Sequence, residues 1–79
     1  MNGKLQKIFA LRKSIKEVTQ IVRKDYPDFT KWATQVDQDI EELFTNYLDE
    51  PNNENFDAFG KHWFSTEPVI RQIMEGKLS

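Results

Sequence analysis

Apolar residues recur at alternating steps of three and four through the first part of the chain, and this spacing constrains the fold more than any other feature. The residues concerned are Ile8, Leu11, Ile15, Val18 and Val22. Such spacing places all of them on one stripe of an α-helix. The helix should end before Pro27, because a residue that precedes proline disfavours the helical conformation. The pattern therefore predicts a first helix over residues 4–24.

A second amphipathic segment begins at Pro27, since proline suits the first turn of a helix. Asp25 or Tyr26 can cap this helix, and Asp28 lies near the positive end of its dipole. We therefore predict a second helix over residues 27–48, followed by a polar turn. Its apolar face is formed by Phe29, Trp32, Val36, Ile40, Leu43 and Tyr47.

Two weaker helical signals follow the turn. Aromatic residues at steps of three and four predict a helix over residues 54–64, with Asn53 or Asn55 as its cap. The segment 65–68, Ser-Thr-Glu-Pro, is typical of a new helix start, which predicts a further helix over residues 67–75. One kinked third helix fits the same pattern, but the start signal favours four elements.

The fold class follows from these helices and from the composition. The chain has 79 residues and no cysteine, so neither a disulfide nor a cysteine-bound zinc ion can support so small a core. Aromatic residues make up 13% of the chain, and each can bury about 150–250 Å² of surface. We expect an all-α, compact bundle of three to four short helices that forms a single domain over residues 1–79.

The apolar stretches are too short for a membrane protein. The longest unbroken apolar run extends from Ile8 to Leu11, far below the roughly 20 residues of a membrane span. No signal-peptide core precedes the first predicted helix. We therefore expect a cytoplasmic protein with no membrane span.

Charge is divided unevenly along the chain, although the formal net charge is only −2. Residues 1–24 contain seven basic groups and one acid, which gives +6. Residues 25–57 contain ten acids and one lysine, which gives −9, and residues 58–79 contribute +1. Such a division indicates either a charged surface that meets a partner or two segments that neutralise each other. We expect the first two helices to lie antiparallel, so that their basic and acidic residues face one another.

The sequence lacks the groups that catalysis, metal binding or nucleotide binding would need. His62 is the single histidine, and a zinc site usually takes four ligands that are mostly cysteine and histidine. Ser65 follows His62 by three residues, but no third group is placed to orient a base, and the three glycines are scattered. Asp57 and Lys61 have the spacing of an ordinary helical ion pair. We expect no catalytic activity, no cofactor and no bound metal.

The densest acidic stretch lies in the second predicted helix and comprises Asp37, Asp39, Glu41 and Glu42. At about 100° per residue, Asp37, Glu41 and Glu42 point away from the apolar face. A solvated helix face explains them most simply, and an acidic docking surface is the alternative. Asp37 and Glu41 are like charges four residues apart, which disfavours an isolated helix. We therefore expect a basic partner for them, either in the first helix or in another protein.

The first helix carries a second stripe, about 90–140° from the centre of its apolar seam. Its members are Leu5, Phe9, Arg12, Lys16 and Arg23. In one interpretation, Leu5 and Phe9 pack on the C-terminal aromatic residues, and the basic side chains cover this junction with their aliphatic stems. In the other, the stripe is a partner surface with apolar anchors at one end and a basic rim at the other.

These observations predict a small, non-catalytic regulator or adaptor that binds another protein or forms a homodimer. Nucleic-acid binding by the basic first helix is the alternative. The pI near 5.3 has the wrong sign for a nucleic-acid footprint, so protein is the favoured partner. The predicted contact residues are Leu5, Phe9, Arg12, Lys16 and Arg23 of the first helix, with Asp37 and Glu41 as a second patch.

Overall fold

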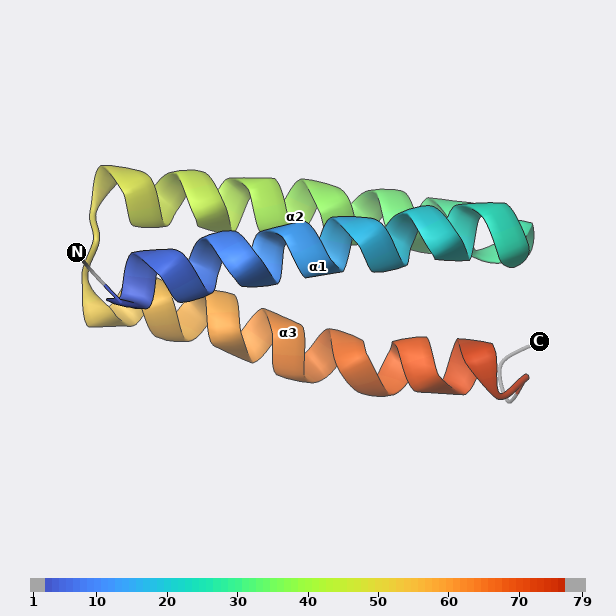
Figure 1. Cartoon of the computed structure of the whole chain (residues 1–79). Helices are drawn as coiled ribbons and strands as arrows, with labels where there is room; N and C mark the ends of the chain where they lie inside the picture. The colour runs from blue at the N-terminus through green and yellow to red at the C-terminus, as the bar shows by residue number, and fades with distance from the viewer. Residues whose placement is uncertain (1–2, 77–79) are drawn as a thin grey trace.

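Three long helices lie side by side in the computed structural model, which describes residues 3–76 (Figure 1). They are α1 (Gly3–Asp25), α2 (Thr30–Asp49) and α3 (Asn53–Met74), and a 3-10 turn, η1 (Pro27–Phe29), joins α1 to α2. The helix direction reverses at each connection, so α2 is antiparallel to both α1 and α3. The bundle measures 40 × 18 × 17 Å. The predicted all-α bundle is thereby confirmed.

The turn between α1 and α2 is set by Pro27. Tyr26 leaves the helical conformation, with φ −133° and ψ 65°, and Pro27 then begins the 3-10 turn. The Thr30 hydroxyl donates to the Pro27 carbonyl at 2.7 Å. The predicted side-chain cap is wrong, because Asp25 belongs to α1 and Tyr26 occupies the cap position without a side-chain hydrogen bond. The α-helical part of the second element accordingly begins three residues later than the sequence predicts.

Two asparagines close the turn between α2 and α3. The Asn52 side chain caps α3 by accepting a hydrogen bond from the Asn55 backbone N–H at 2.8 Å. The Asn55 side-chain amide donates to the carbonyls of Asn46 and Glu50, at 3.1 and 2.8 Å. The same two carbonyls also accept hydrogen bonds from the backbone N–H groups of Glu50 and Asn52, at 2.9 and 2.8 Å, so the Asn55 amide adds a second hydrogen bond to each at the end of α2. The predicted caps, Asn53 and Asn55, are therefore wrong: the cap lies one residue earlier, and Asn55 serves the preceding helix.

Helix α3 passes through Pro68 without a break, so the four-element arrangement is wrong and the single third helix is confirmed. Pro68 has no N–H for the carbonyl of Phe64, but both residues are exposed, and water can satisfy that carbonyl. Ser65 and Thr66 do not begin a new helix. Their hydroxyls instead donate to the His62 carbonyl, at 2.9 and 2.7 Å. Continuity keeps the buried Thr66 on the same side of α3 as the apolar residues before and after it.

The core runs along the axis between the helices. The predicted seam of α1 is confirmed, since Ile8, Ile15 and Val22 are buried and the other two members are half-buried. Within the described residues, every buried side-chain polar atom has a hydrogen-bond partner. The main buried cluster consists of Ile8, Ile15, Val36, Ile40, Phe44, Tyr47 and Phe59, which come from all three helices.

Replacement of Pro68 by alanine tests the continuity of α3. Alanine restores an N–H and has high helix propensity. In a continuous helix, Pro68→Ala should therefore raise the free energy of unfolding by about 1–2 kcal/mol, a figure that allows for the unfolded-state entropy that proline removes. If a new helix began here, proline would favour its first turn, and the substitution would leave stability unchanged or lower it. Urea unfolding followed by circular dichroism separates the two results.

Candidate interaction surface

A buried polar contact joins the middle of α1 to α2. The Thr19 side chain is fully buried, and its hydroxyl donates to Asp37 Oδ1 at 2.7 Å. The same hydroxyl lies 3.0 Å from the carbonyl of Lys16. The other carboxylate oxygen of Asp37 accepts a hydrogen bond from the Arg23 guanidinium and forms an ion pair with it. Only 23% of the Asp37 side chain is exposed, so water screens this pair less than it screens an exposed one.

Glu41, one turn further along α2, holds two cations of α1. Its Oε1 atom lies 2.8 Å from Arg12 Nη2 and 2.6 Å from Lys16 Nζ. The hydrogen bond from Lys16, together with the charge and hydrogen bond of Arg12, holds the pKa of Glu41 below its ordinary value. Partial burial opposes this effect but does not overcome it. The Glu41 carboxylate is therefore the meeting point of the two basic side chains.

These contacts explain the divided charge of the sequence. The basic side chains Arg12, Lys16 and Arg23 face the acidic stretch of α2, as the antiparallel arrangement predicts. Asp37 is not part of a solvated helix face, and that interpretation is wrong for this residue because Thr19 and Arg23 cover it. Asp37 and Glu41, the like charges four residues apart, therefore find their basic partners in α1.

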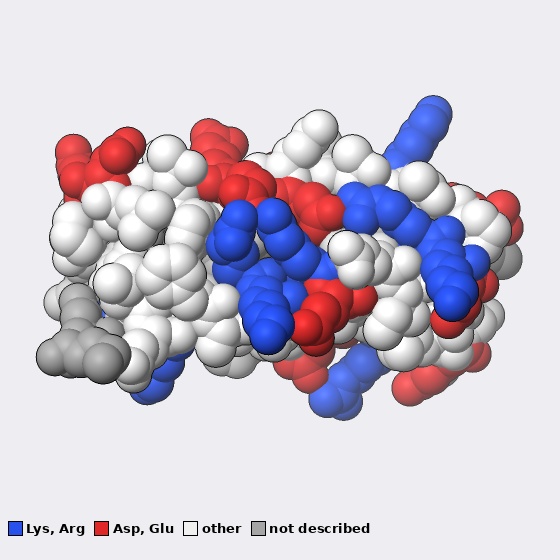
Figure 2. Space-filling view, turned by 45° about the horizontal axis from the view of Figure 1, so that its top comes forward, with Lys and Arg blue, Asp and Glu red and all other residues white. Residues whose placement is uncertain are grey.

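The outer side of this contact forms a shallow polar groove between α1 and α2. The groove has a volume of about 440 Å³ and is open to solvent. Figure 2 shows basic and acidic side chains interleaved along the middle of this face, with a mainly uncharged area at the end where α1 begins and α2 ends. The charges of the groove largely satisfy one another, so it offers little unpaired charge to a ligand. Its lining residues are Lys16, Gln20, Arg23, Asp37, Gln38 and Glu41.

The uncharged end of the same face is built on Phe44 of α2. The Phe9 and Phe44 rings pack edge to face, with a centroid distance of 5.2 Å and an interplanar angle of 67°. The Arg12 guanidinium lies over the Phe44 ring, 4.6 Å from its centroid. Leu48 follows Phe44 by one helical turn, and 49% of its surface is exposed, as is 49% of Phe9. Two half-exposed apolar side chains therefore flank one buried aromatic ring.

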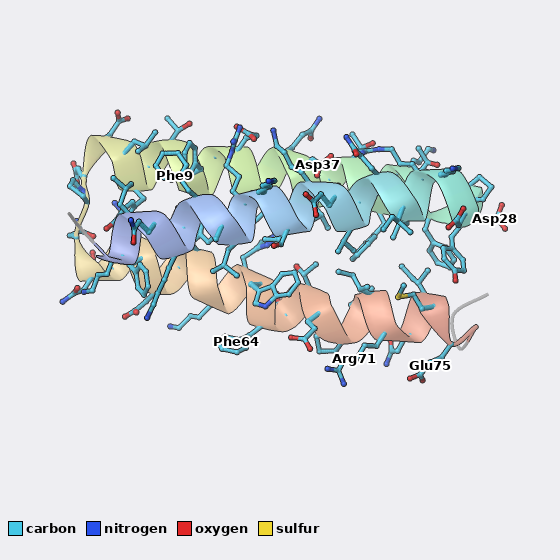
Figure 3. The ribbon with its side chains drawn as sticks, viewed as in Figure 1. Phe9, Asp28, Asp37, Phe64, Arg71 and Glu75 are labelled. Atoms are coloured by element: carbon cyan, nitrogen blue, oxygen red, sulfur yellow. The ribbon has the colours of Figure 1, made fainter. Side chains whose placement is uncertain are left out.

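The residues predicted to contact a partner thus divide into a charged group and an apolar group, the latter consisting of Leu5 and Phe9. All seven lie along the α1–α2 contact or beside it, and the five charged ones are engaged in ion pairs within the chain. Leu5 is half-buried against the core, whereas Phe9 points into the seam between α1 and α2 from the outer side (Figure 3). The expectation that Phe9 packs on the C-terminal aromatic residues is wrong, because its ring partner is Phe44 of α2.

His62 lies at the boundary between α2 and α3, with 19% of its side chain exposed. Its Nε2 atom is 3.5 Å from Asp39 Oδ2, and its Nδ1 atom is 3.3 Å from the Thr66 hydroxyl. The hydroxyl of Ser65 donates to the His62 backbone carbonyl rather than to the imidazole. Within residues 3–76, no group of three histidine or carboxylate side chains gathers in a way that could hold a metal ion.

Sequence reasoning missed Thr19, Phe44 and Leu48. Thr19 follows Ile15 by four residues and precedes Val22 by three, so the helical spacing itself places it on the seam. Because threonine is polar, it is not counted among the apolar residues of that seam. Phe44 follows Ile40 by four residues and could have been found in the same way. The exposure of Leu48 depends on where α2 meets α1, and the sequence pattern carries no signal for that.

Comparisons with protein-family models, with curated proteins and with solved structures gave no match to this chain. Among the helices that the structure describes, none combines the length and the apolar character needed to cross a membrane. The function must therefore be argued from the surface chemistry of the bundle.

The pKa of Glu41 gives a test of its pairing with Arg12 and Lys16. Because 41% of the Glu41 side chain is exposed, Glu41→Gln should lower the free energy of unfolding at neutral pH by less than about 1 kcal/mol. The folded-state pKa lies below the unfolded one. The stabilisation is therefore complete above the unfolded value of about 4.3 and is lost as the pH falls through the folded value.

The difference between the wild type and Glu41→Gln should thus shrink below about pH 4 and also in high salt. Glu42→Gln is the matched control, since Glu42 is the exposed neighbour in the sequence, and at neutral pH it should lower the free energy of unfolding by less than Glu41→Gln does. A stability difference that grows in acid, or that salt does not change, would contradict the pairing. Urea unfolding over a range of pH values provides the measurement.

Proposed function

We propose that this chain is a non-catalytic adaptor or regulator that binds another protein through the uncharged end of the α1–α2 face. The observation that carries the proposal is the position of Phe9, which is held on Phe44 while 49% of its surface is exposed. Aromatic side chains in such positions are typical energetic centres of protein interfaces. Leu48 extends the apolar area on the α2 side.

The surroundings of Phe9 fit a protein partner better than other ligands. The ring is packed against Phe44 on one side, so a partner would cover a side chain that is already partly ordered, which lowers the entropy cost of binding. The Arg12 guanidinium is held beside it by Glu41 and by the Phe44 ring. An apolar centre with an ordered arginine at its rim has the composition of a protein-binding patch.

The charge distribution supports protein rather than nucleic acid as the partner. Affinity for nucleic acid scales with the number of phosphates that basic groups can neutralise. Three of the basic side chains of α1, those of Arg12, Lys16 and Arg23, are already paired with carboxylates of α2. A phosphate backbone would have to compete with these carboxylates and would meet their negative charge.

Site-specific photo-cross-linking from position 9 tests the proposal. Phe9 is replaced by benzoylphenylalanine in cells that express the chain, and the adducts are identified by mass spectrometry. We expect a covalent adduct with another protein. The purified pair should then bind in solution. Phe9→Glu or Leu48→Glu should raise the dissociation constant of the pair at least about tenfold, the usual effect of removing an interface anchor.

Phe64→Glu is the matched control, because Phe64 is also an exposed phenylalanine but lies on the opposite side of the bundle (Figure 3). Partner binding should be the same for Phe64→Glu and the wild type. Unchanged binding by Phe9→Glu, or adducts with nucleic acid alone, would overturn the proposal. Circular dichroism of each variant confirms that any loss of binding is not a loss of fold.

A further inference from the structure

The outward side of α3 carries the most exposed large apolar side chain among the described residues. Phe64 is 73% exposed and points away from α1 and α2 (Figure 3). Burial of a phenylalanine from this state would remove a large apolar surface from water. The surface around Phe9, Phe44 and Leu48, called the Phe9 surface below, is built from α1 and α2. A contact at Phe64 on α3 is therefore independent of the function proposed above.

Beside Phe64 lies a hollow of about 200 Å³ that is lined by Phe56, Asp57, Gly60, Lys61 and Phe64. Gly60 forms its floor, and a side-chain carbon added there would meet no atom within 4 Å. Four of the lining residues, at positions 57, 60, 61 and 64, have the spacing that forms the hole for a side-chain knob in helix–helix packing. The absence of a side chain at Gly60 thus leaves room for a side chain from a second helix.

On this side of α3, acidic and basic residues lie at equal distances before and after Phe64. An antiparallel second copy of the helix would therefore place opposite charges across from each other. Asp57 lies seven residues before Phe64, and Arg71 lies seven residues after it. Lys61 and Glu67 lie three residues before and after it in the same way. In an antiparallel pair of α3 helices centred on Phe64, each acid therefore lies opposite a base.

The remaining contacts of these residues leave such a pairing open. The sequence predicts an ion pair between Asp57 and Lys61, but this prediction is wrong: among residues 3–76, neither forms an ion pair. The Arg71 side chain is 72% exposed, and its one ion pair in the described chain is with Glu67, at 2.7 Å. A second copy of the chain would give both Asp57 and Lys61 the partners that they lack.

We propose that this side of α3 binds the same side of a second copy of the chain, as an antiparallel, two-fold symmetric dimer centred on Phe64. In this register the two Phe64 rings meet at the two-fold axis, and the hollow over Gly60 of each copy lies opposite Pro68 of the other, since both residues lie four positions from Phe64. Asp57 of each copy pairs with Arg71 of the other, and Lys61 pairs with Glu67. The surface is self-complementary, as a two-fold interface must be.

The size of the contact sets the strength of the association. A contact made by one helix from each copy buries less than the roughly 1,600 Å² of a standard stable interface. We therefore expect a dimer that dissociates in the micromolar range or above, so that its population depends on concentration. Such a dimer would present two Phe9 surfaces to partners, one from each copy.

Sedimentation equilibrium of the purified chain over micromolar to millimolar concentrations tests the dimer directly. We expect the apparent mass to rise from the monomer value of 9.4 kDa toward twice that value. Phe64→Ser should weaken dimerisation at least about tenfold without loss of helical content, because the side chain is 73% exposed. Phe9→Ser is the matched control and should dimerise like the wild type.

Charge reversal tests the antiparallel register. Asp57→Arg alone places two arginines opposite each other at both ends of the interface, and Arg71→Asp alone does the same with two aspartates. Each variant should be monomeric under conditions where the wild type is a dimer. An equimolar mixture of Asp57→Arg and Arg71→Asp should form heterodimers, because the arginine introduced into one variant then meets the aspartate introduced into the other.

A wild-type chain that stays monomeric to millimolar concentration would overturn the dimer. A wild-type dimer that Phe64→Ser leaves intact, or a mixture of the charge variants that stays monomeric, would overturn the proposed surface or its register. None of these results bears on partner binding through Phe9, which is measured with a different protein and a different variant. The two proposals can therefore fail separately.

Discussion

The antiparallel packing of α1 against α2 fixes the position of almost every other group in the molecule. Apolar side chains such as Ile15 and Ile40 are fully buried between the helices, and Thr19, one helical turn after Ile15, contributes a hydrogen bond to Asp37. Because this hydroxyl has its partner inside the protein, the register of the two helices is coupled to a specific polar contact. A shift by one turn would break the hydrogen bond between Thr19 and Asp37 and leave the buried hydroxyl with only the Lys16 carbonyl of its own helix, a loss in addition to that of apolar contact.

The packing of α1 against α2 explains why basic and acidic residues are concentrated in different segments of the sequence. A chain with +6 in its first 24 residues and −9 in the next 33 would repel itself within each segment if the segments were separate. In the folded chain, Arg12, Lys16 and Arg23 neutralise Glu41 and Asp37 across the helix contact. The ionic contacts occupy the middle of the α1–α2 face, and the apolar end around Phe9 and Phe44 is the part that we propose binds a partner.

The helices could be predicted from the sequence because apolar spacing is a local property of the chain. The same spacing gave the buried seam of α1, including Ile8, Ile15 and Val22. The continuity of α3 could not be predicted, because Ser65, Thr66 and Pro68 carry a genuine start signal that tertiary packing overrides. Whether Asp37 faced solvent or another helix also depended on how α1 and α2 meet in space. Phe9 of the candidate surface could therefore be proposed from the sequence, while the exposure of Leu48 and Phe64 required the three-dimensional arrangement.

A double-mutant cycle between Arg23 and Asp37 tests most directly whether the divided charges stabilise the fold by pairing across α1 and α2. Arg23→Gln, Asp37→Asn and the double variant keep the side-chain sizes similar, and an asparagine can still accept the hydrogen bond from Thr19. We expect a coupling free energy of at least about 0.5 kcal/mol, since residues in one hydrogen-bonded ion-pair network do not act additively. Strictly additive effects of the two substitutions on the free energy of unfolding would contradict this account.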